Sequence, residues 1–128
     1  MTPLVLDSGG VTALAQRRPS AAALIETFIR DEIWPPVVPS VVLAECVSGR
    51  QRTDAAVNRF LEHCEVIEVL PELVARRAGT LRALAGRGSA TDAVVVAGAE
   101  PGGTVLTGDV ADLRALAEYA EDVEVRRP

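Results

Sequence analysis

Short apolar runs alternate with amphipathic stretches along this chain. The apolar runs end at Pro, Gly, Ser or Asp, which is typical of short buried strands. The stretches between them carry apolar residues three and four positions apart, as one face of a helix does. The predicted strands cover residues 3–7, 37–39, 66–70, 104–107 and 123–125, and the predicted helices cover 8–16, 21–33, 41–48, 53–64, 72–85, 89–99 and 109–119.

Strands that alternate with helices favour parallel pairing, right-handed crossovers and helices on both faces of the sheet. The predicted class is therefore α/β, a three-layer α/β/α sandwich with a mainly parallel sheet of four or five short strands. With 128 residues and no repeat or linker, residues 1–128 fit a single domain. In open sheets of this kind, ligands bind beyond the carboxyl ends of the strands.

Composition narrows the chemistry. Apolar residues make up 48% of the chain, but none of their runs reaches the roughly 18 residues of a membrane span, and no secretory signal is visible at the N-terminus. We therefore expect a cytoplasmic protein that does not contact a membrane. Cys46 and Cys64 lack CxxC spacing and are predicted to be reduced packing residues.

Two residue counts exclude several mechanisms. All 13 basic residues are arginine, so no mechanism that needs a lysine applies. His63 is the only histidine, which excludes a two-histidine ribonuclease, and we predict that it is a surface residue. The net charge of −5 argues against a protein that coats nucleic acid nonspecifically.

Five acids lie at or near places where a predicted strand hands over to a helix. If the fold collects such junctions at one edge, their negative charges need a cation between them. Carboxylate oxygens without clustered His or Cys favour Mg²⁺ or Mn²⁺ over Zn²⁺, and a metal-activated water is the chemistry that remains. The five acids are Asp7, Glu45, Asp92, Asp109 and Asp112.

Most of these acids also have a simpler explanation as helix caps. Asp7 can cap the helix that follows it, Asp109 and Asp112 have the spacing of a capping pair, and Asp92 completes a capping box that begins at Ser89. Glu45 is the exception. It lies inside the apolar stretch 41–47, where we expect it to be buried and to need a counter-charge.

The acids lie in four spaced motifs, which are Val5-Leu6-Asp7-Ser8, Pro39-Ser40-Val41-Val42-Leu43-Ala44-Glu45, Thr91-Asp92-Ala93 and Leu106-Thr107-Gly108-Asp109-Val110-Ala111-Asp112-Leu113. In this order they closely resemble the motifs of PIN-domain proteins, and more narrowly those of VapC-type toxins from bacterial toxin–antitoxin pairs. The resemblance covers essentially the whole chain.

The resemblance implies an endoribonuclease that depends on one or two Mg²⁺ or Mn²⁺ ions and leaves 5′-phosphate and 3′-hydroxyl ends. Asp112 matches a further acidic position that acts through water, and Thr107 matches a hydroxyl that orients a ligand. Many relatives carry one more acid before the third motif, but 87–89 offers none, so the second ion stays open. The positions that match catalytic residues and metal ligands are Asp7, Glu45, Asp92 and Asp109.

The resemblance also implies a homodimer and a cognate VapB-like antitoxin, which often places a basic side chain among the acids. The apolar stripes on 21–33 and 53–64 could form such interfaces, but core packing explains them equally well. Contacts to the RNA substrate are expected from arginines in turns or at helix ends. These are Arg17, Arg18, Arg50, Arg52 and Arg87.

Two other functions fit part of the pattern. A non-catalytic PIN-like domain would bind only RNA or a protein partner, although intact acids at all four motifs argue against it. A phosphatase of the haloacid dehalogenase type or a receiver domain would use a lysine near its acids, and the chain has none. The phosphatase would also need an acid where Gly9 stands.

Overall fold

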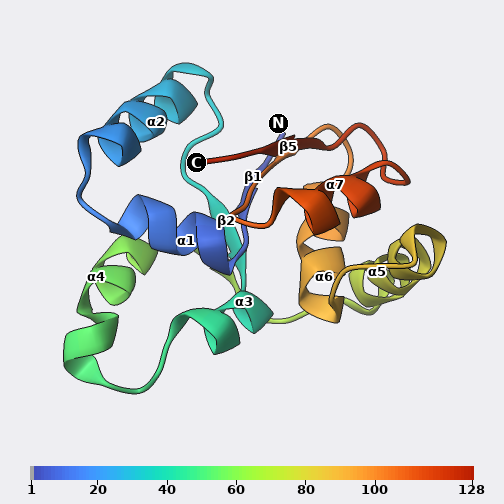
Figure 1. Ribbon diagram of the computed structural model, residues 1–128, viewed down its shortest axis with the longest axis horizontal. Coiled ribbons are helices and arrows are strands. Elements are labelled where there is room, and N and C mark those ends of the chain that lie inside the picture. Colours follow the sequence, from blue (N-terminus) through green and yellow to red (C-terminus); the bar gives the residue numbers. More distant parts are fainter. Residues whose placement is uncertain (1) are drawn as a thin grey trace.

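A five-stranded parallel sheet forms the middle layer of the computed structural model, which describes residues 2–128 (Figure 1). The strand order is β3-β2-β1-β4-β5, so the order reverses between β1 and β4. This arrangement confirms the predicted α/β class with a parallel sheet. The strands are β1 (Leu4–Leu6), β2 (Val37–Pro39), β3 (Glu65–Ile67), β4 (Thr104–Leu106) and β5 (Glu124–Arg126).

Helices cover both faces of the sheet. In Figure 1, α1, α2 and α4 lie on one side, α5, α6 and α7 lie on the other, and α3 lies near one end of the sheet. Each helix falls close to a range that the hydrophobic pattern predicts. Their bounds are α1 (Ser8–Ala15), α2 (Pro19–Arg30), α3 (Ser40–Cys46), α4 (Gln51–Leu61), α5 (Glu72–Ala85), α6 (Ala90–Ala99) and α7 (Val110–Ala117).

The core lies between β1 and the very apolar helix α6. All three β1 residues are fully buried, and α6 buries Ala93–Ala97 and Ala99. Small and β-branched side chains let this helix pack closely on the sheet, between α5 and α7. Phe28 of α2 and Phe60 of α4 are buried from the opposite face, so core packing accounts for most of the two apolar stripes on those helices.

The third strand is shorter than predicted. It ends at Ile67, because its partner β2 ends at Pro39, where the chain turns into α3. Ser40 is the first residue of that helix and does not cap it. Its hydroxyl donates to the Glu68 carbonyl at 2.9 Å instead and ties α3 to the segment after β3. Val69, beyond the end of the strand, is 75% exposed.

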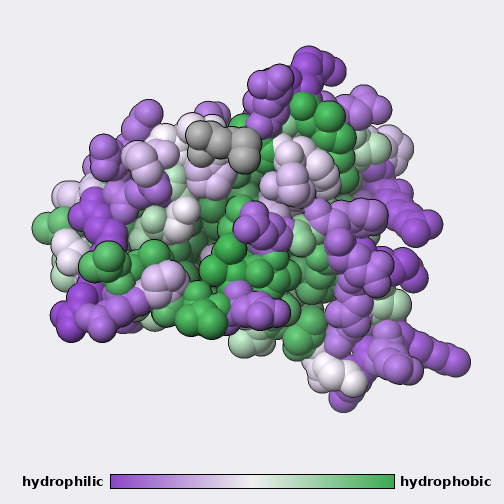
Figure 2. All heavy atoms as spheres, turned by 180° about the vertical axis from the view of Figure 1, so that it is seen from behind, coloured by the Kyte–Doolittle hydropathy of each residue, from purple (hydrophilic) through white to green (hydrophobic). Residues whose placement is uncertain are grey.

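Several other large apolar side chains remain at the surface of the described residues, including Val41, Leu70 and Leu73. Figure 2 shows hydrophobic residues gathered across the middle of the face opposite to the view of Figure 1. Cys46 and Cys64 are half-buried free thiols, as expected of packing residues. Within residues 2–128, every helix is too short or too polar to cross a membrane.

Candidate metal centre

Two neighbouring strands bring the first and fourth motifs together. β1 and β4 pair in parallel with Leu6 opposite Leu106, so Asp7 and Thr107 leave the sheet side by side. This is the place where the strand order reverses, the usual position of a ligand site in an open α/β sheet. Thr107 is fully buried, and its hydroxyl donates a hydrogen bond to Asp7.

Glycines allow this close approach. A Cβ atom on Gly9 would lie 2.7 Å from the amide nitrogen of Gly108, and one on Gly10 would lie 2.4 Å from the carbonyl oxygen of Leu106. Only glycine lets the first turn of α1 lie against the loop after β4. Sequence reasoning missed this role, although two adjacent glycines directly after Asp7 were a visible signal of it.

Asp7 is a buried helix cap inside a hydrogen-bonded network. One oxygen accepts from the Gly10 amide at 2.8 Å, and the other accepts from Thr107, whose hydroxyl oxygen accepts from the Asp109 amide at 2.8 Å. Burial raises the pKa of Asp7 despite these two hydrogen bonds, and the charges of Asp92 and Asp109 raise it further. Asp7 therefore lies within electrostatic reach of Asp92 and Asp109.

The other predicted caps also form. Asp109 caps α7, and its Oδ1 accepts from the Asp112 amide at 3.4 Å. Ser89 and Asp92 form a complete capping box at the start of α6, with hydrogen bonds of 3.0 and 3.1 Å. These bonds fix the carboxylates in orientation at the ends of two adjacent helices.

Asp92, Asp109 and Asp112 form the group that could hold a metal ion. Their ligand oxygens all lie within 4.8 Å of one another. Since Mg²⁺ holds oxygens at about 2.0–2.1 Å, two of its ligands lie at most about 4.2 Å apart, so the set needs to close by at most about 0.6 Å. Within residues 2–128, one oxygen of each of these carboxylates accepts a hydrogen bond and the other oxygen accepts none. An all-carboxylate set with one open oxygen on each acid fits Mg²⁺ or Mn²⁺.

Arg87 reaches into this group. Its Nε lies 2.7 Å from Oδ1 of Asp112, in an ion pair whose two side chains are 55% and 28% exposed. The arginine supplies a positive charge at the rim of the acids. This contact joins the turn after α5 to the first turn of α7, and no local signal in the sequence predicted an acidic partner for Arg87.

The expectation that Glu45 is buried is wrong. Glu45 is exposed, and so is its neighbour Ala44, because α3 is a short helix near the end of the sheet and buries only Val42. Glu45 is also not part of the three-acid group described above. The charges of Glu45 and Asp7 both raise the pKa of Cys46, after the larger effect of burial, so these two acids act on the same part of the molecule.

The five candidate RNA-binding arginines are all exposed, but they do not lie in one place. Arg50 and Arg52 lie at the start of α4, and Arg87 lies at the acidic group. Arg17 and Arg18 lie between α1 and α2, and Arg17 lines a pocket with residues of α4.

Comparison with known proteins supports the fold. No family model and no curated protein matches this sequence. One similar solved structure is VapBC2 from Rickettsia felis bound to a DNA fragment from their promoter, with a TM-score of 0.73 and 16% identity over 98% of both chains.

Two further solved structures share the fold. DNA-bound VapBC from Salmonella typhimurium matches with a TM-score of 0.70 and 18% identity over 99% of this chain and 98% of that one. PAE2754 from Pyrobaculum aerophilum matches with a TM-score of 0.62 and 18% identity over 97% and 90%. These full-length likenesses confirm the fold that the resemblance to PIN-domain, VapC-type proteins implies.

Proposed function

We propose that this chain is a metal-dependent endoribonuclease toxin of the VapC type. The observation that carries the proposal is the group of three carboxylates, Asp92, Asp109 and Asp112, at the point where the strand order reverses. The same fold occurs in chains of two VapBC complexes, which supports the toxin assignment and an antitoxin partner. Because its substrate would be RNA, we propose that it acts in the cytoplasm.

The three-acid group would hold one or two Mg²⁺ or Mn²⁺ ions, with Asp7, whose pKa the charges of Asp92 and Asp109 raise, and Glu45 as further proposed ligands. Such an ion supplies a Lewis acid that activates a water and stabilises the charge of the phosphodiester during in-line attack. Asp109, the N-cap of α7, and Asp112, in its first turn, each keep one oxygen that accepts no hydrogen bond from residues 2–128. Thr107 holds Asp7 and the Asp109 amide together, so the buried and exposed acids keep a fixed spacing.

Partners follow from the surface around the site. The exposed apolar side chains of Val41, Val69 and Leu70 line a groove of about 220 Å³, a kind of surface that a second subunit or an antitoxin segment could cover. The acidic group itself would attract a basic side chain of the antitoxin, in the way that it already holds Arg87. We therefore propose a homodimer and a VapB-like antitoxin.

Cleavage of total RNA tests the proposal. The purified chain, its Asp92→Asn and Asp109→Asn variants and an Asp31→Asn control are incubated with RNA and with Mg²⁺, Mn²⁺ or chelator. Asp31 is an exposed acid at the end of α2, far along the chain from the site. We expect wild type and the control to cut RNA only with metal, and the two site variants to lose at least about 100-fold in rate, as an enzyme does when the group that binds its metal is removed.

Thermal denaturation with Mn²⁺ gives a second readout that needs no RNA. Saturation at about 100 times the dissociation constant stabilises by roughly 2.7 kcal/mol, which should raise the midpoint by several degrees in wild type and not in the site variants. Cleavage that survives chelator, or equal cleavage by all variants, would refute the metal mechanism. If metal stabilises the protein but no RNA is cut, the result would instead support a non-catalytic domain that only binds RNA or a protein partner.

A further inference from the structure

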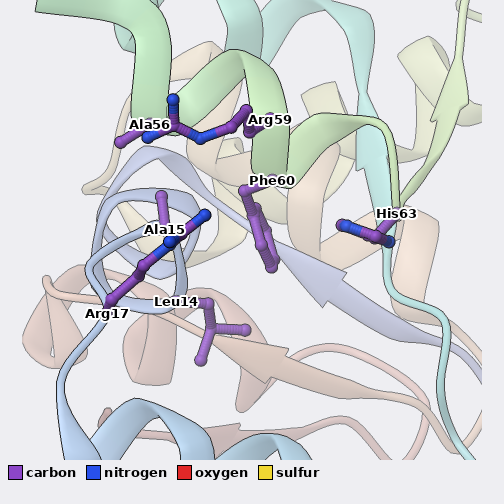
Figure 3. Close-up of a pocket in the computed structure, with 7 residues that line it drawn as sticks. All are labelled: Leu14, Ala15, Arg17, Ala56, Arg59, Phe60 and His63. Carbon is purple, nitrogen blue, oxygen red and sulfur yellow. The ribbon is translucent and has the colours of Figure 1, made fainter.

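A second site lies at the other end of α1, away from the acidic group. Arg17, Arg59 and His63 surround a pocket of about 130 Å³ between the end of α1 and α4. Figure 3 shows Arg17 and Arg59 approaching the same space from different elements, with the ring of Phe60 beside them and His63 beyond that ring. The remaining lining residues, Leu14, Ala15 and Ala56, are small or apolar.

The pocket gathers positive charge without an acid. No carboxylate lines it, and neither Arg17 nor Arg59 takes part in an ion pair with any of residues 2–128. Two guanidinium groups that share a pocket repel each other, and an anion bound between them removes that repulsion.

Residues of the hydrophobic core line the pocket beside the two arginines. Residues 56, 59 and 63 are three and four positions apart, so they lie on one side of α4 and its C-terminal turn. Phe60 is only 7% exposed and Leu14 only 5%, and both belong to the hydrophobic core. The small side chain of Ala56 leaves open space beside Arg59. Buried core residues therefore form the base of the pocket, although the side chains of the two arginines are exposed.

We propose that this pocket binds a backbone phosphate of RNA, at a distance from the bond that is cut. The inference rests on the proposed ribonuclease function. Arginine presents a planar fork of donors that matches a phosphate group, and the pocket has room for more than a water molecule. The eight residues of α1 place the pocket about 12 Å from Asp7. A phosphate bound in the pocket is therefore a different one from the phosphate at the acidic group.

Binding of a fluorescently labelled single-stranded RNA of about a dozen nucleotides, measured by anisotropy in chelator at several salt concentrations, tests the site without cleavage. The test variant is Arg17→Gln with Arg59→Gln, and a second variant replaces both arginines by lysine. The matched control is Arg30→Gln with Arg127→Gln, since these arginines are also exposed and outside the ion pairs of residues 2–128.

We expect the double glutamine variant to bind RNA about tenfold more weakly or worse, because it loses two charge-assisted contacts. Its slope of log affinity against log salt should become shallower by roughly 0.7, the value for one lost phosphate contact on a single strand. The double lysine variant should keep most of the slope, and the control should change affinity less than about twofold. Equal thermal midpoints of the lysine variant and wild type show that the fold around the pocket is intact.

Several outcomes would overturn the inference. An unchanged salt slope in the double glutamine variant removes the phosphate site. The inference also fails if the double glutamine variant loses binding to a hexaglutamate peptide but binds RNA as tightly as wild type. That result would assign the pocket to an acidic protein segment. The proposed function can fail separately. If wild type binds RNA through the two arginines but never cuts it with Mn²⁺, the phosphate-binding pocket is supported and the ribonuclease function is refuted.

Discussion

Replacing Thr107 by valine tests the network that joins the two central motifs. The side chains have nearly the same shape, so the change removes the hydroxyl and little else. Thr107 is fully buried and makes two hydrogen bonds, one donated to the carboxylate of Asp7 and one accepted from the Asp109 amide. The change therefore leaves a buried carboxylate with one donor fewer.

The expected loss follows from the two bonds. A hydrogen bond to a charged group contributes about 1.5–3 kcal/mol, and one between neutral groups contributes about 0.5–1.5 kcal/mol. The Asp109 side chain is exposed, so water can partly replace the partner of its amide. We expect Thr107→Val to lower the free energy of unfolding by about 2 to 4 kcal/mol, measured by urea denaturation near neutral pH in the absence of metal.

The pH dependence gives the sharper test. Thr107 donates to the ionised form of Asp7 and so lowers a pKa that burial raises. Removing this donor raises the pKa of Asp7 further. The charge-dependent part of the loss is therefore complete above the pKa of Asp7 in the variant and disappears below its pKa in wild type. Denaturation at a series of pH values should show the two proteins converging toward acid.

Thr104→Val is the matched control. Thr104 lies in β4, the strand that Thr107 follows, and its hydroxyl neither donates a hydrogen bond to residues 2–128 nor accepts one from them. We therefore expect its free energy of unfolding to change by less than about 0.5 kcal/mol at every pH. A loss below about 0.5 kcal/mol for Thr107→Val, or a loss that grows toward acid, would refute the network as described.

Three further predictions test the surroundings of the site. Gly10→Ala should destabilise by at least about 2 kcal/mol in urea, because its Cβ would lie 2.4 Å from a backbone oxygen, whereas Gly79→Ala, with open space around its Cβ, should stabilise by about 0.5–1 kcal/mol. Burial opposes the charge of Asp54, but hydrogen bonds from the 48–50 loop lower its pKa overall. Asp54→Asn should thus lower the thermal midpoint at neutral pH, with the difference shrinking as pH falls through that pKa. Burial raises the pKa of Cys46 to about 11 and that of Cys64 to about 12, so native protein at pH 8 should react with a thiol reagent at least about 100-fold more slowly than unfolded protein.

Local signals in the sequence predicted most of the fold and the helix caps at Asp7, Asp92 and Asp109. Alternating short apolar runs and helical stripes gave the element order, because each strand end carries its own turn or cap residue. Ser89 and Asp92 show why this works: a capping box is a contact between residues three positions apart and needs no knowledge of the rest of the molecule.

Glu45 shows where local signals end. Its apolar neighbours predicted burial, but a helix is buried only on the side where other elements pack. α3 is short and lies near the end of the sheet, so Val41 and Val47 are exposed together with Glu45. Which side of a helix the fold covers is a long-range property. The same holds for Gly10, whose need for space arises from Leu106, almost a hundred residues away.

The cap and the metal-ligand interpretations of the aspartates are compatible, although sequence reasoning weighed them as alternatives. A cap hydrogen bond occupies one oxygen of Asp92 and one of Asp109, and the second oxygen of each accepts no hydrogen bond from residues 2–128. Capping would thus orient the proposed ligands before any ion binds and reduce the reorganisation that binding requires. Asparagine keeps an oxygen that can cap but has no charge. Asp→Asn at these positions therefore separates the two roles, because the helix starts survive while the attraction for a cation is lost.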